Sequence, residues 1–289
     1  MKLSIITINY NNAEGLRRTL ASVASQTYRD IEHIIVDAAS TDGSVDVISE
    51  YVNKVESGAS RVKSVIWSSE PDRGIYDGMN KGIRKATGDY VWILNAGDCA
   101  ASADVVQRII DALDVCNAPI LLGNIVRVCP ENKRQYSPLP VDRKSASLPL
   151  PMDISMLTFY RGTVPQDAAF VRRDLFEKYG YFDDSLKICA DWKLYLNMIA
   201  LDGVVPMYVN IDVVLFDMTG VSNANNELRL TERRAYLEQV LPASVIKDYD
   251  NYHFPIEEYN RLRKYHLWGI VYFLERVLFK LEKWHVLKK

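Results

Sequence analysis

Short apolar runs alternate with stretches of helical periodicity along the first hundred residues. Apolar runs of strand length cover residues 2–8, 31–36, 63–67 and 90–94. Between them, apolar side chains recur at helical spacing in residues 13–25, 45–51 and 76–86. Runs this apolar are typical of strands that are buried on both faces. The pattern therefore predicts an α/β fold with a parallel sheet and helices on both of its faces.

The second half of the chain is less regular. We expect strands at 168–171 and 213–216, a hairpin or strand pair at 118–128, and a mobile loop rich in Pro, Ser and charge at 130–151. Helices are expected at 101–106, 173–179, 190–201, 227–240 and from 256 onward. No internal repeat and no clean linker divides the sequence into independent domains.

Length and composition fit one sizeable core, or a main domain with an appendage, since the 289 residues are 48% hydrophobic. The net charge of −2 and the pI near 6.1 give no reason to expect nucleic acid as a partner. The charge is uneven, however, because eight Lys or Arg residues stand against two Glu from Arg261 to the end. A basic tail on an acidic body predicts an anionic surface as its partner.

The four cysteines, at positions 99, 116, 129 and 189, show no C-x-x-C pair and no metal-finger spacing. The chain starts directly with a predicted strand, which leaves no room for a targeting segment. No apolar run reaches the 18 or more residues of a spanning helix, and the longest candidate, 267–274, stops at Glu275. We therefore expect reduced thiols in a cytoplasmic protein.

Polar side chains gather where each predicted strand ends. They are Asn9, Tyr10 and Asn11, then Asp37 with Asp42, then Glu70 and Asp72, and finally Asn95 and Asp98. In an open α/β sheet, ligands bind outside the carboxyl ends of the strands, so the pattern predicts a nucleotide site at this edge. The alternative is that polar residues simply occupy loops, which explains their polarity but not the repeated aspartates.

The stretch from Tyr90 to Asp98 joins a buried strand directly to a carboxylate. A lone Asp at a strand end can hold a hard divalent cation, which in turn can hold phosphate oxygens. Asp98 can equally cap the helix that we expect at 101–106. This stretch by itself leaves both interpretations open.

Four motifs at these strand ends resemble the family 2 glycosyltransferases, of the type that builds bacterial surface polysaccharides. They are SIITINYN at 4–11, IVDAASTDGS at 35–44, SEPDRGIYDGMNKGI at 69–83 and GDYVWILNAGD at 88–98. Weaker similarity follows at 165–166, 190–192 and 219–222. The resemblance implies the GT-A fold, a Rossmann-like and mostly parallel sheet with helices on both faces.

The resemblance also implies roles for individual residues. It implies that Asp37 hydrogen-bonds the nucleotide base and that Asp98 ligates Mg²⁺ or Mn²⁺ on the donor diphosphate. It implies that Asp191 is the general base for the acceptor hydroxyl, and one base without a second catalytic carboxylate fits a single displacement with inversion. The other implied contacts are nucleotide binding by Thr7, Asn9, Tyr10, Asp42, Asp72 and Asn95, and contacts to the donor or acceptor sugar by Asp77, Gln166 and Trp192.

Some positions depart from the family pattern. Asn95 and Gly97 stand where many relatives have acids, so that Asp98 is the one metal carboxylate left. Met79 stands where many relatives have an Arg, and Pro165 where many surface-polysaccharide relatives have a His. Each departure puts one expected contact in doubt, but none removes Asp98.

Three of the residues singled out have simpler explanations. Asp42, which precedes Gly43, can serve only a turn or a helix cap. Asp191 can be the N-cap of the helix from 192 to 201, although a base at a helix start would also be rigidly aimed. His33 lies within a strand and is expected to be structural.

These features predict an inverting, metal-dependent glycosyltransferase with a nucleotide-sugar donor, a UDP-sugar foremost. Its acceptor would be a growing cell-surface glycan of the capsule, exopolysaccharide or O-antigen type, presented on a lipid carrier. The alternative is a non-catalytic nucleotide- or sugar-binding module on the same fold. The missing acids at Asn95 and Gly97 favour that alternative, whereas Asp98 and Asp191 argue against it.

We expect a GT-A domain over residues 1–225, with a nucleotide-binding half at 1–100 and an acceptor half at 101–225. A helical extension at 226–289 follows, and its part from 261 is basic and amphipathic. A helix of this kind can lie on an anionic membrane, which would place the protein on the inner face of the plasma membrane. It can also pack on the catalytic domain or form a homodimer.

Overall fold

The computed structural model describes residues 1–128, 134–136, 149–217, 225–251, 269–270, 273–274 and 276–278. The chain forms two compact units, Met1–Arg234 and Ala235–Lys289. The first unit contains the sheet and the candidate site. The domain boundary expected after residue 225 stays a prediction.

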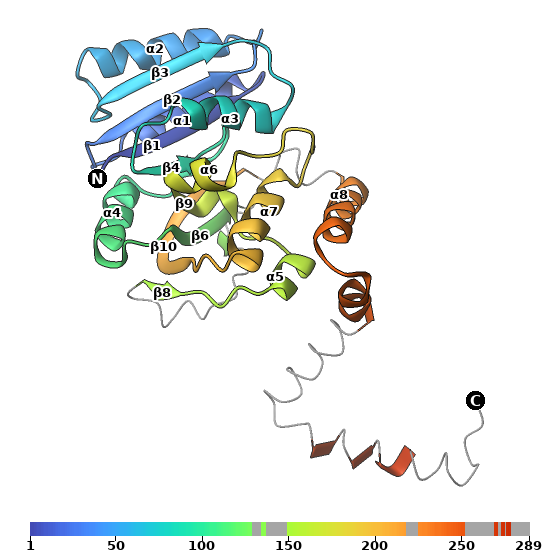
Figure 1. Ribbon diagram of the computed structural model, residues 1–289. Helices are drawn as coiled ribbons and strands as arrows, with labels where there is room; N and C mark the ends of the chain where they lie inside the picture. Colours follow the sequence, from blue (N-terminus) through green and yellow to red (C-terminus); the bar gives the residue numbers. More distant parts are fainter. Residues whose placement is uncertain are drawn as a thin grey trace. The chain divides into compact units, whose positions relative to one another are not determined.

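The strands of the described residues form one mixed sheet (Figure 1). Its order is β3-β2-β1-β4-β9-β6-β10-β5, with β7 paired to β6 and β8 paired to β10. The pairs β3-β2, β2-β1, β1-β4 and β6-β10 are parallel, whereas β9 and β5 run antiparallel to their neighbours. The strands are β1 (Leu3–Asn9), β2 (Ile31–Asp37), β3 (Ser64–Ser69), β4 (Tyr90–Ile93), β5 (Cys99–Ala100), β6 (Ile120–Val128), β7 (Arg134–Tyr136), β8 (Leu150–Pro151), β9 (Ala169–Arg172) and β10 (Met207–Phe216).

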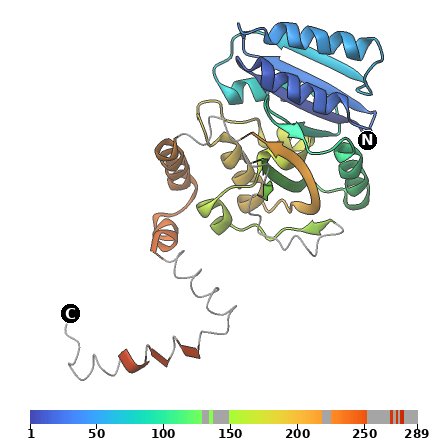
Figure 2. The same ribbon diagram turned by 180° about the vertical axis from the view of Figure 1, so that it is seen from behind.

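Helices cover both faces of this sheet, as Figures 1 and 2 show from opposite sides. They are α1 (Ala13–Ala24), α2 (Ser44–Glu56), α3 (Ile75–Lys85), α4 (Val105–Cys116), α5 (Met156–Arg161), α6 (Asp174–Tyr179), α7 (Ala190–Tyr195) and α8 (Asn226–Val240). A 3-10 turn at Gln166–Ala168 precedes β9, and a π-helical segment at Leu196–Leu201 continues α7. The predicted α/β fold with helices on both faces is confirmed.

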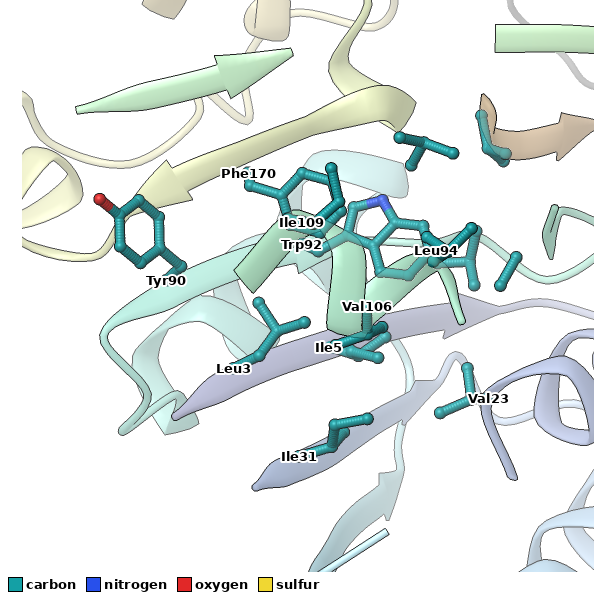
Figure 3. Close-up of a cluster of buried hydrophobic side chains, with 14 of the residues drawn as sticks. Leu3, Ile5, Val23, Ile31, Tyr90, Trp92, Leu94, Val106, Ile109 and Phe170 are labelled. Carbon is teal, nitrogen blue, oxygen red and sulfur yellow. The ribbon is translucent and has the colours of Figure 1, made fainter. Parts of the chain in front are cut away.

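Successive side chains of β1 point to opposite faces of the sheet and pack against different helices. Leu3 and Ile5 belong to a buried cluster with residues of α1, α2 and α4. Figure 3 shows part of this cluster, including Val23 of α1 and Val106 of α4. Each fully buried aliphatic side chain of this kind contributes about 1.5–3 kcal/mol to stability. Ile6 faces α3 instead, where a Cβ on Gly82 would lie only 2.4 Å from Cγ2 of Ile6. Glycine at position 82 therefore allows α3 to approach the sheet closely.

The parallel register brings the strand ends together. Asn9 at the end of β1 lies beside Asp37, and Asp37 lies beside Ser69 at the end of β3. On the other side of β1, Ile6 lies beside Ile93 of β4, so the turn after β4 emerges at the same edge. The sheet therefore collects the polar strand ends where the sequence predicted.

Three expectations for the second half are wrong. Residues 118–128 contain the single strand β6 rather than a hairpin, and β6 pairs in parallel with β10. The helix expected at 101–106 begins only at Val105, after β5. The segment 130–151 is not a loop throughout, because β7 and β8 join the sheet. Residues 137–148, 219–222 and most of the helix expected from 256 lie outside the described residues.

Within the described residues, no helix is both long and apolar enough to cross a membrane. Two other structural expectations, for the cysteines and for His33, can be compared with the structure directly. Cys99, Cys116 and Cys189 are free thiols, and Cys129 is not among the described residues. His33 is buried in β2, where its ring contacts the hydroxyls of Thr7 (3.0 Å) and Tyr51 (2.8 Å). Burial lowers the pKa of His33 to about 3, so the ring is neutral and structural.

Candidate active site

The ends of β1, β2 and β3 carry a group of side chains that we call the Asp37 cluster: Asn9, Asp37, Ser40 and Ser69. The buried carboxylate accepts hydrogen bonds from Asn9 Nδ2 (2.8 Å) and Ser69 Oγ (2.6 Å). Ser40 adds its backbone N–H (2.9 Å) and its hydroxyl (2.6 Å). Burial raises the pKa of Asp37, but these donors outweigh it and hold the pKa below its ordinary value. The cluster keeps a charged carboxylate at the sheet edge.

Two further residues expected to bind the nucleotide lie beside this cluster. Tyr10 is 67% exposed, which leaves its ring accessible at the end of β1. Asp72 precedes α3 and accepts from the backbone N–H of Gly74 at 3.0 Å. Burial raises the pKa of Asp72, so its carboxylate is less well satisfied than that of Asp37.

Two other residues expected to bind the nucleotide, Asp42 and Thr7, make their hydrogen bonds within the fold. Asp42 accepts from the backbone N–H of Ala13 (2.8 Å) and from the N–H and hydroxyl of Ser44 (3.1 and 2.6 Å). Its carboxylate thus ties together the starts of α1 and α2, although the N-caps of these helices are Asn12 and Gly43. Asp42 therefore serves the turn, which is one of the two structural roles that the sequence allowed. Thr7 is buried, and its hydroxyl donates to the Leu94 carbonyl at 2.9 Å.

The turn after β4 holds Asp98 at the sheet edge. Thr19 of α1 fixes this turn, because its Oγ1 donates to the Asp98 carbonyl (2.7 Å) and accepts from the N–H of Gly97 (2.9 Å). Asp98 Oδ1 accepts from the backbone N–H of Asp217, which follows β10 (2.8 Å). The N-cap of α4 is Asp104, so Asp98 does not cap that helix.

The same turn favours glycine at position 97. Gly97 has a φ of 111°, which L side chains rarely adopt. A Cβ at this position would also lie 3.1 Å from Oδ2 of Asp217, so that this carboxylate would have to shift slightly. Backbone strain and close contact therefore both disfavour a side chain here.

Four carboxylates, Asp98, Asp167, Asp191 and Asp217, are close enough for their charges to interact, and we call them the acidic cluster. Burial and the charges of Asp167 and Asp217 raise the pKa of Asp98. Burial and the charge of Asp191 raise the pKa of Asp167, whose Oδ1 accepts from Asn95 Nδ2 at 3.3 Å. Arg18 pairs with Asp217 at 3.4 Å, at one end of the cluster. The raised pKa values of Asp98 and Asp167 show that these two carboxylates favour a bound cation or proton.

The acidic cluster supplies the oxygen donors that a hard cation prefers. Among the described residues, no three acid, His or Cys side chains are arranged to hold a metal ion together. Mg²⁺ and Mn²⁺ often take one or two carboxylates and complete their shell with substrate phosphates and water. The donors present therefore fit a cation that Asp98 would hold together with substrate oxygens.

Asp191 lies in the first turn of α7, whose N-cap is Cys189, so Asp191 is not the N-cap. Tyr76 of α3 places its hydroxyl 2.8 Å from Asp191 Oδ1 and 2.6 Å from the carbonyl of Ile188. Burial raises the pKa of Asp191, and the hydrogen bond from Tyr76 opposes the rise. A carboxylate held in this way suits proton abstraction.

Three of the four remaining side chains are less accessible. Trp192 is 1% exposed, and its Nε1 donates to the Phe159 carbonyl at 2.9 Å, so the ring belongs to the interior. Gln166 and Asn95 each leave one buried amide atom, Nε2 and Oδ1 respectively, without a hydrogen-bond partner in the described part of the chain. A bound ligand can satisfy such atoms.

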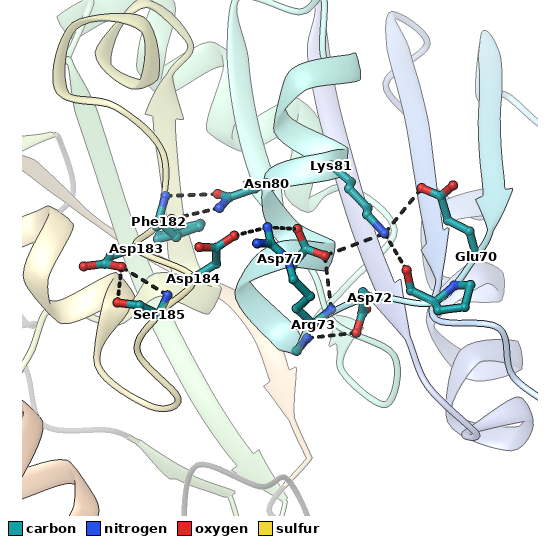
Figure 4. A network of polar contacts seen from close by, with 12 residues as sticks. Glu70, Asp72, Arg73, Asp77, Asn80, Lys81, Phe182, Asp183, Asp184 and Ser185 are labelled. Atoms are coloured by element: carbon teal, nitrogen blue, oxygen red, sulfur yellow. Dashed lines mark hydrogen bonds and ion pairs between the residues drawn. The ribbon is translucent and has the colours of Figure 1, made fainter.

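Asp77 lies in an ion-pair network that ties α3 to the segment 182–185 (Figure 4). Arg73 bridges Asp77 Oδ1 (3.0 Å) and Asp184 Oδ2 (2.5 Å). Lys81 approaches Asp77 Oδ2 at 3.7 Å. The carboxylate expected to contact a sugar is thus held by cations, and its role in binding stays a prediction.

The structure therefore collects Asn9, Asp37, Asn95, Asp98 and Asp191 around the carboxyl ends of the strands. No role was predicted from the sequence for five participants: Ser40, Ser69, Tyr76, Asp167 and Asp217. Their signals were weak, because three of them lie inside motifs that carry the resemblance, Asp167 merely follows Gln166, and Asp217 lies in none of the motifs.

Comparisons with known proteins identify the family of the chain. The model of the family described as Glycosyl transferase family 2 matches residues 4–180. An uncharacterized glycosyltransferase of Mycobacterium tuberculosis is 33% identical over 222 residues, which cover 76% of this chain and 77% of the relative. A PGL/p-HBAD biosynthesis glycosyltransferase of Mycobacterium bovis is 28% identical over 221 residues, which cover 76% and 78%.

Solved structures share the fold. The S. aureus TarS fragment 1–349 in complex with UDP-GlcNAc has a TM-score of 0.59 and 20% identity, over 78% of this chain and 62% of that chain. The mannosyltransferase PcManGT from Pyrobaculum calidifontis, in complex with GDP-Man and Mn²⁺, has a TM-score of 0.54 and 19% identity, over 81% and 61%. Both matches span less than two thirds of the neighbour's chain, and at this identity they establish the fold alone.

Proposed function

Because the chain belongs to glycosyl transferase family 2 and has the GT-A fold, we propose that it transfers a sugar from a nucleotide-sugar donor to a glycan acceptor with inversion. The chain is a glycosyltransferase by family, as the sequence predicted. One observation carries the finer proposal. The turn after β4 brings Asp98 into the acidic cluster, which also contains Asp191, the carboxylate that Tyr76 holds.

In this proposal the nucleotide lies across the ends of β1 and β2. The Asp37 cluster holds the base, and the buried Oδ1 of Asn9, which has no partner among the described residues, offers an additional acceptor. Asp98 would hold Mg²⁺ or Mn²⁺ on the donor diphosphate, and the cation would neutralise charge on the leaving group. The raised pKa of Asp98 supports this role, since a cation relieves the repulsion that raises it.

Asp191 acts as the general base. It accepts the proton of the acceptor hydroxyl while that oxygen forms a bond to the anomeric carbon and the nucleoside diphosphate leaves. Tyr76 orients the carboxylate, and burial increases its affinity for the proton. One base on one side of the sugar is consistent with a single displacement.

The known proteins support a nucleotide-sugar donor. The structurally similar TarS fragment binds UDP-GlcNAc, and PcManGT binds GDP-Man with Mn²⁺. The relative from Mycobacterium bovis is named a PGL/p-HBAD biosynthesis glycosyltransferase, which supports a role in the biosynthesis of a glycosylated product. We propose a UDP-sugar donor and a lipid-linked acceptor.

Calorimetry with UDP and GDP, with and without Mn²⁺, tests the donor site, and transfer from UDP-, GDP- and dTDP-sugars tests the activity. Asp98→Ala should remove the Mn²⁺-dependent part of nucleotide binding and leave the melting temperature nearly unchanged. The exposed Asp114→Ala on α4 is the matched control and should bind as wild type does. Unchanged Mn²⁺-dependent affinity in Asp98→Ala would remove Asp98 from the site. Nucleotide binding without any transfer would favour the non-catalytic module.

A second part of the proposal concerns the C-terminal unit. Five helical side chains in it are apolar and exposed, and their spacing places them on one stripe: Ile270, Phe273, Leu274, Val277 and Leu278. The surrounding sequence is basic. A stripe of this kind in a basic segment suits the headgroup region of an anionic membrane, where each basic residue adds about 1 kcal/mol. We propose that this segment places the enzyme on the inner face of the plasma membrane.

Flotation with anionic and with neutral vesicles tests this part. The full chain should float with anionic vesicles only, and a double substitution, Phe273→Glu with Leu274→Glu, should reduce its recovery about tenfold or more. Ser244→Glu, at an exposed position of the same unit, should float as wild type does. Equal recovery of the double variant would point to a homodimer or a protein contact instead.

A further inference from the structure

Helix α8 contacts the candidate active site through the turn that leads into α7. The carboxylate of Glu232 accepts hydrogen bonds from three consecutive backbone N–H groups. They belong to Lys187 (2.7 Å), Ile188 (3.1 Å) and Cys189 (3.0 Å). The thiol of Cys189 also lies 3.5 Å from the carbonyl of Arg229. Hydrogen bonds to a charged acceptor are worth more than neutral ones, so this turn is held firmly.

The same turn is held from its other side by α3. Tyr76 contacts the Ile188 carbonyl, and the Ile188 N–H contacts Glu232, so this peptide segment lies between two helices. Asp191 follows three residues later, and the Tyr76 hydroxyl that contacts the Ile188 carbonyl also contacts the Asp191 carboxylate. The position of Asp191 therefore depends on α3 and α8 together.

Arg233, the neighbour of Glu232, lies over the residue that follows Asp191. Its guanidinium carbon is 5.2 Å from the centre of the Trp192 ring, a cation–π distance. The guanidinium is largely buried, and its charge favours the ionised form of Asp191. Four other titratable groups interact with the Asp191 carboxylate: Tyr76, Asp167, Cys189 and Tyr195. Arg233 is the cation that opposes the repulsion between Asp167 and Asp191.

We propose that Glu232 and Arg233 of α8 are positioning residues for the general base: Glu232 fixes the turn that aims Asp191, and Arg233, which lies over the Trp192 ring, supplies a positive charge beside that carboxylate. The inference rests on the proposed function, in which Asp191 is that base. It also extends the active site well past residues 4–180, the part that the family model matches.

The test uses the full chain with Arg233→Met, Arg233→Lys and Glu232→Gln, with Arg234→Met and Glu227→Gln as controls on exposed positions of the same helix. Without the charge of Arg233, the acid limb of the kcat/KM profile should move up by about one pH unit. Arg233→Lys should restore most of the wild-type profile. Glu232→Gln should lower kcat about tenfold and change the donor KM less than twofold. Both controls should behave as wild type does.

Several outcomes overturn the inference. A wild-type pH profile in Arg233→Met would show that Arg233 does not act on the general base. If the loss in Glu232→Gln appeared in KM rather than in kcat, Glu232 would not be a positioning residue for that base. If Arg233→Met fails to melt cooperatively, the profile of Arg233→Gln, which keeps polarity without charge, decides in the same way. An inactive wild type with every donor refutes the proposed function and this inference with it, whereas an active wild type with unaffected variants refutes this inference alone.

Discussion

The Asp37 cluster and the acidic cluster occupy the same edge of one sheet, yet their carboxylates are in opposite states. Asp37 accepts hydrogen bonds from three side chains and one backbone N–H, and its pKa is lowered. Asp98 accepts one backbone N–H and faces like charges, and its pKa is raised. Burial acts on both in the same direction, so the surrounding donors decide the difference.

The comparison teaches that the position of an aspartate at a strand end does not by itself decide what the side chain does. A carboxylate whose acceptor capacity is filled by hydroxyls contributes to the fold and offers a fixed charge to a ligand. A carboxylate with few donors and close like charges has capacity left for a cation or a proton. The following predictions test this division.

The largest effect is expected for Asp191→Asn in the acidic cluster. The amide keeps the size of the side chain but cannot take a proton, so transfer should fall by roughly 10²- to 10⁴-fold, the usual range for acid–base catalysis. Donor affinity should be unchanged by calorimetry. Asp153→Asn, at an exposed position, is the control. Turnover within a few-fold of wild type would place the base elsewhere, first at Asp167 or Asp217.

The next effect is expected for Asp37→Ala and concerns the fold. The substitution leaves Asn9, Ser40 and Ser69 without their shared acceptor, which should lower the free energy of unfolding by about 2–4 kcal/mol. Urea unfolding measures it. Asp98→Ala should cost far less in the same assay, since it removes a repelling charge. A loss below about 1 kcal/mol for Asp37→Ala would contradict the structural role of the cluster.

The smallest effect is a pH dependence of opposite sign in the two clusters, measured with chelator present. The folded-state pKa of Asp98 is raised, so its contribution to wild-type stability is lost as pH rises above the ordinary value of 3.8. The asparagine of Asp98→Asn does not titrate, so the free energy of unfolding of this variant should rise relative to that of wild type as pH rises. The gain should be about 1 kcal/mol for each pH unit between the ordinary pKa and the raised one.

For Asp37 the folded-state pKa is lowered, so its contribution is present above pH 3.8 and is lost as pH falls below that value. The penalty of Asp37→Asn should accordingly shrink in acid. Equal slopes for Asp37→Asn and Asp98→Asn would mean that the two clusters do not differ in charge state.

The first four strands could be predicted from sequence because each is a short apolar run between helices with clear periodicity. The region around β6 could not. Gly123 suggests a turn within an apolar stretch, but the strand continues through it. A Cβ at 123 would lie 2.3 Å from Cγ2 of Val213 and 2.9 Å from the carbonyl of Ile211, so glycine here permits close contact with β10. That reason depends on a strand far along the chain, which no local pattern reveals.

The candidate site divides in the same way. Asp37 and Asp98 follow parallel strands, and their positions could be predicted from the end of each run. Asp167 reaches the end of β4 only because β9 pairs antiparallel with it, with Phe170 beside Trp92. Asp217 reaches Asp98 because β10 pairs antiparallel with β5. Such pairings leave no periodic signal in the sequence.

The turn at Gly97 also bears on how this site can change over generations. The resemblance to the family implies an acid at this position in many relatives, so a single change from Gly to Asp would look like a simple route to a second metal carboxylate. The φ of 111° would cost a side chain about 1–3 kcal/mol, and the Asp217 carboxylate would have to shift by a few tenths of an ångström to admit its Cβ. A cost of this size is a sizeable part of the stability of a domain. A lineage that starts from this backbone therefore gains the second carboxylate more readily after a change that relaxes the turn or adds stability elsewhere.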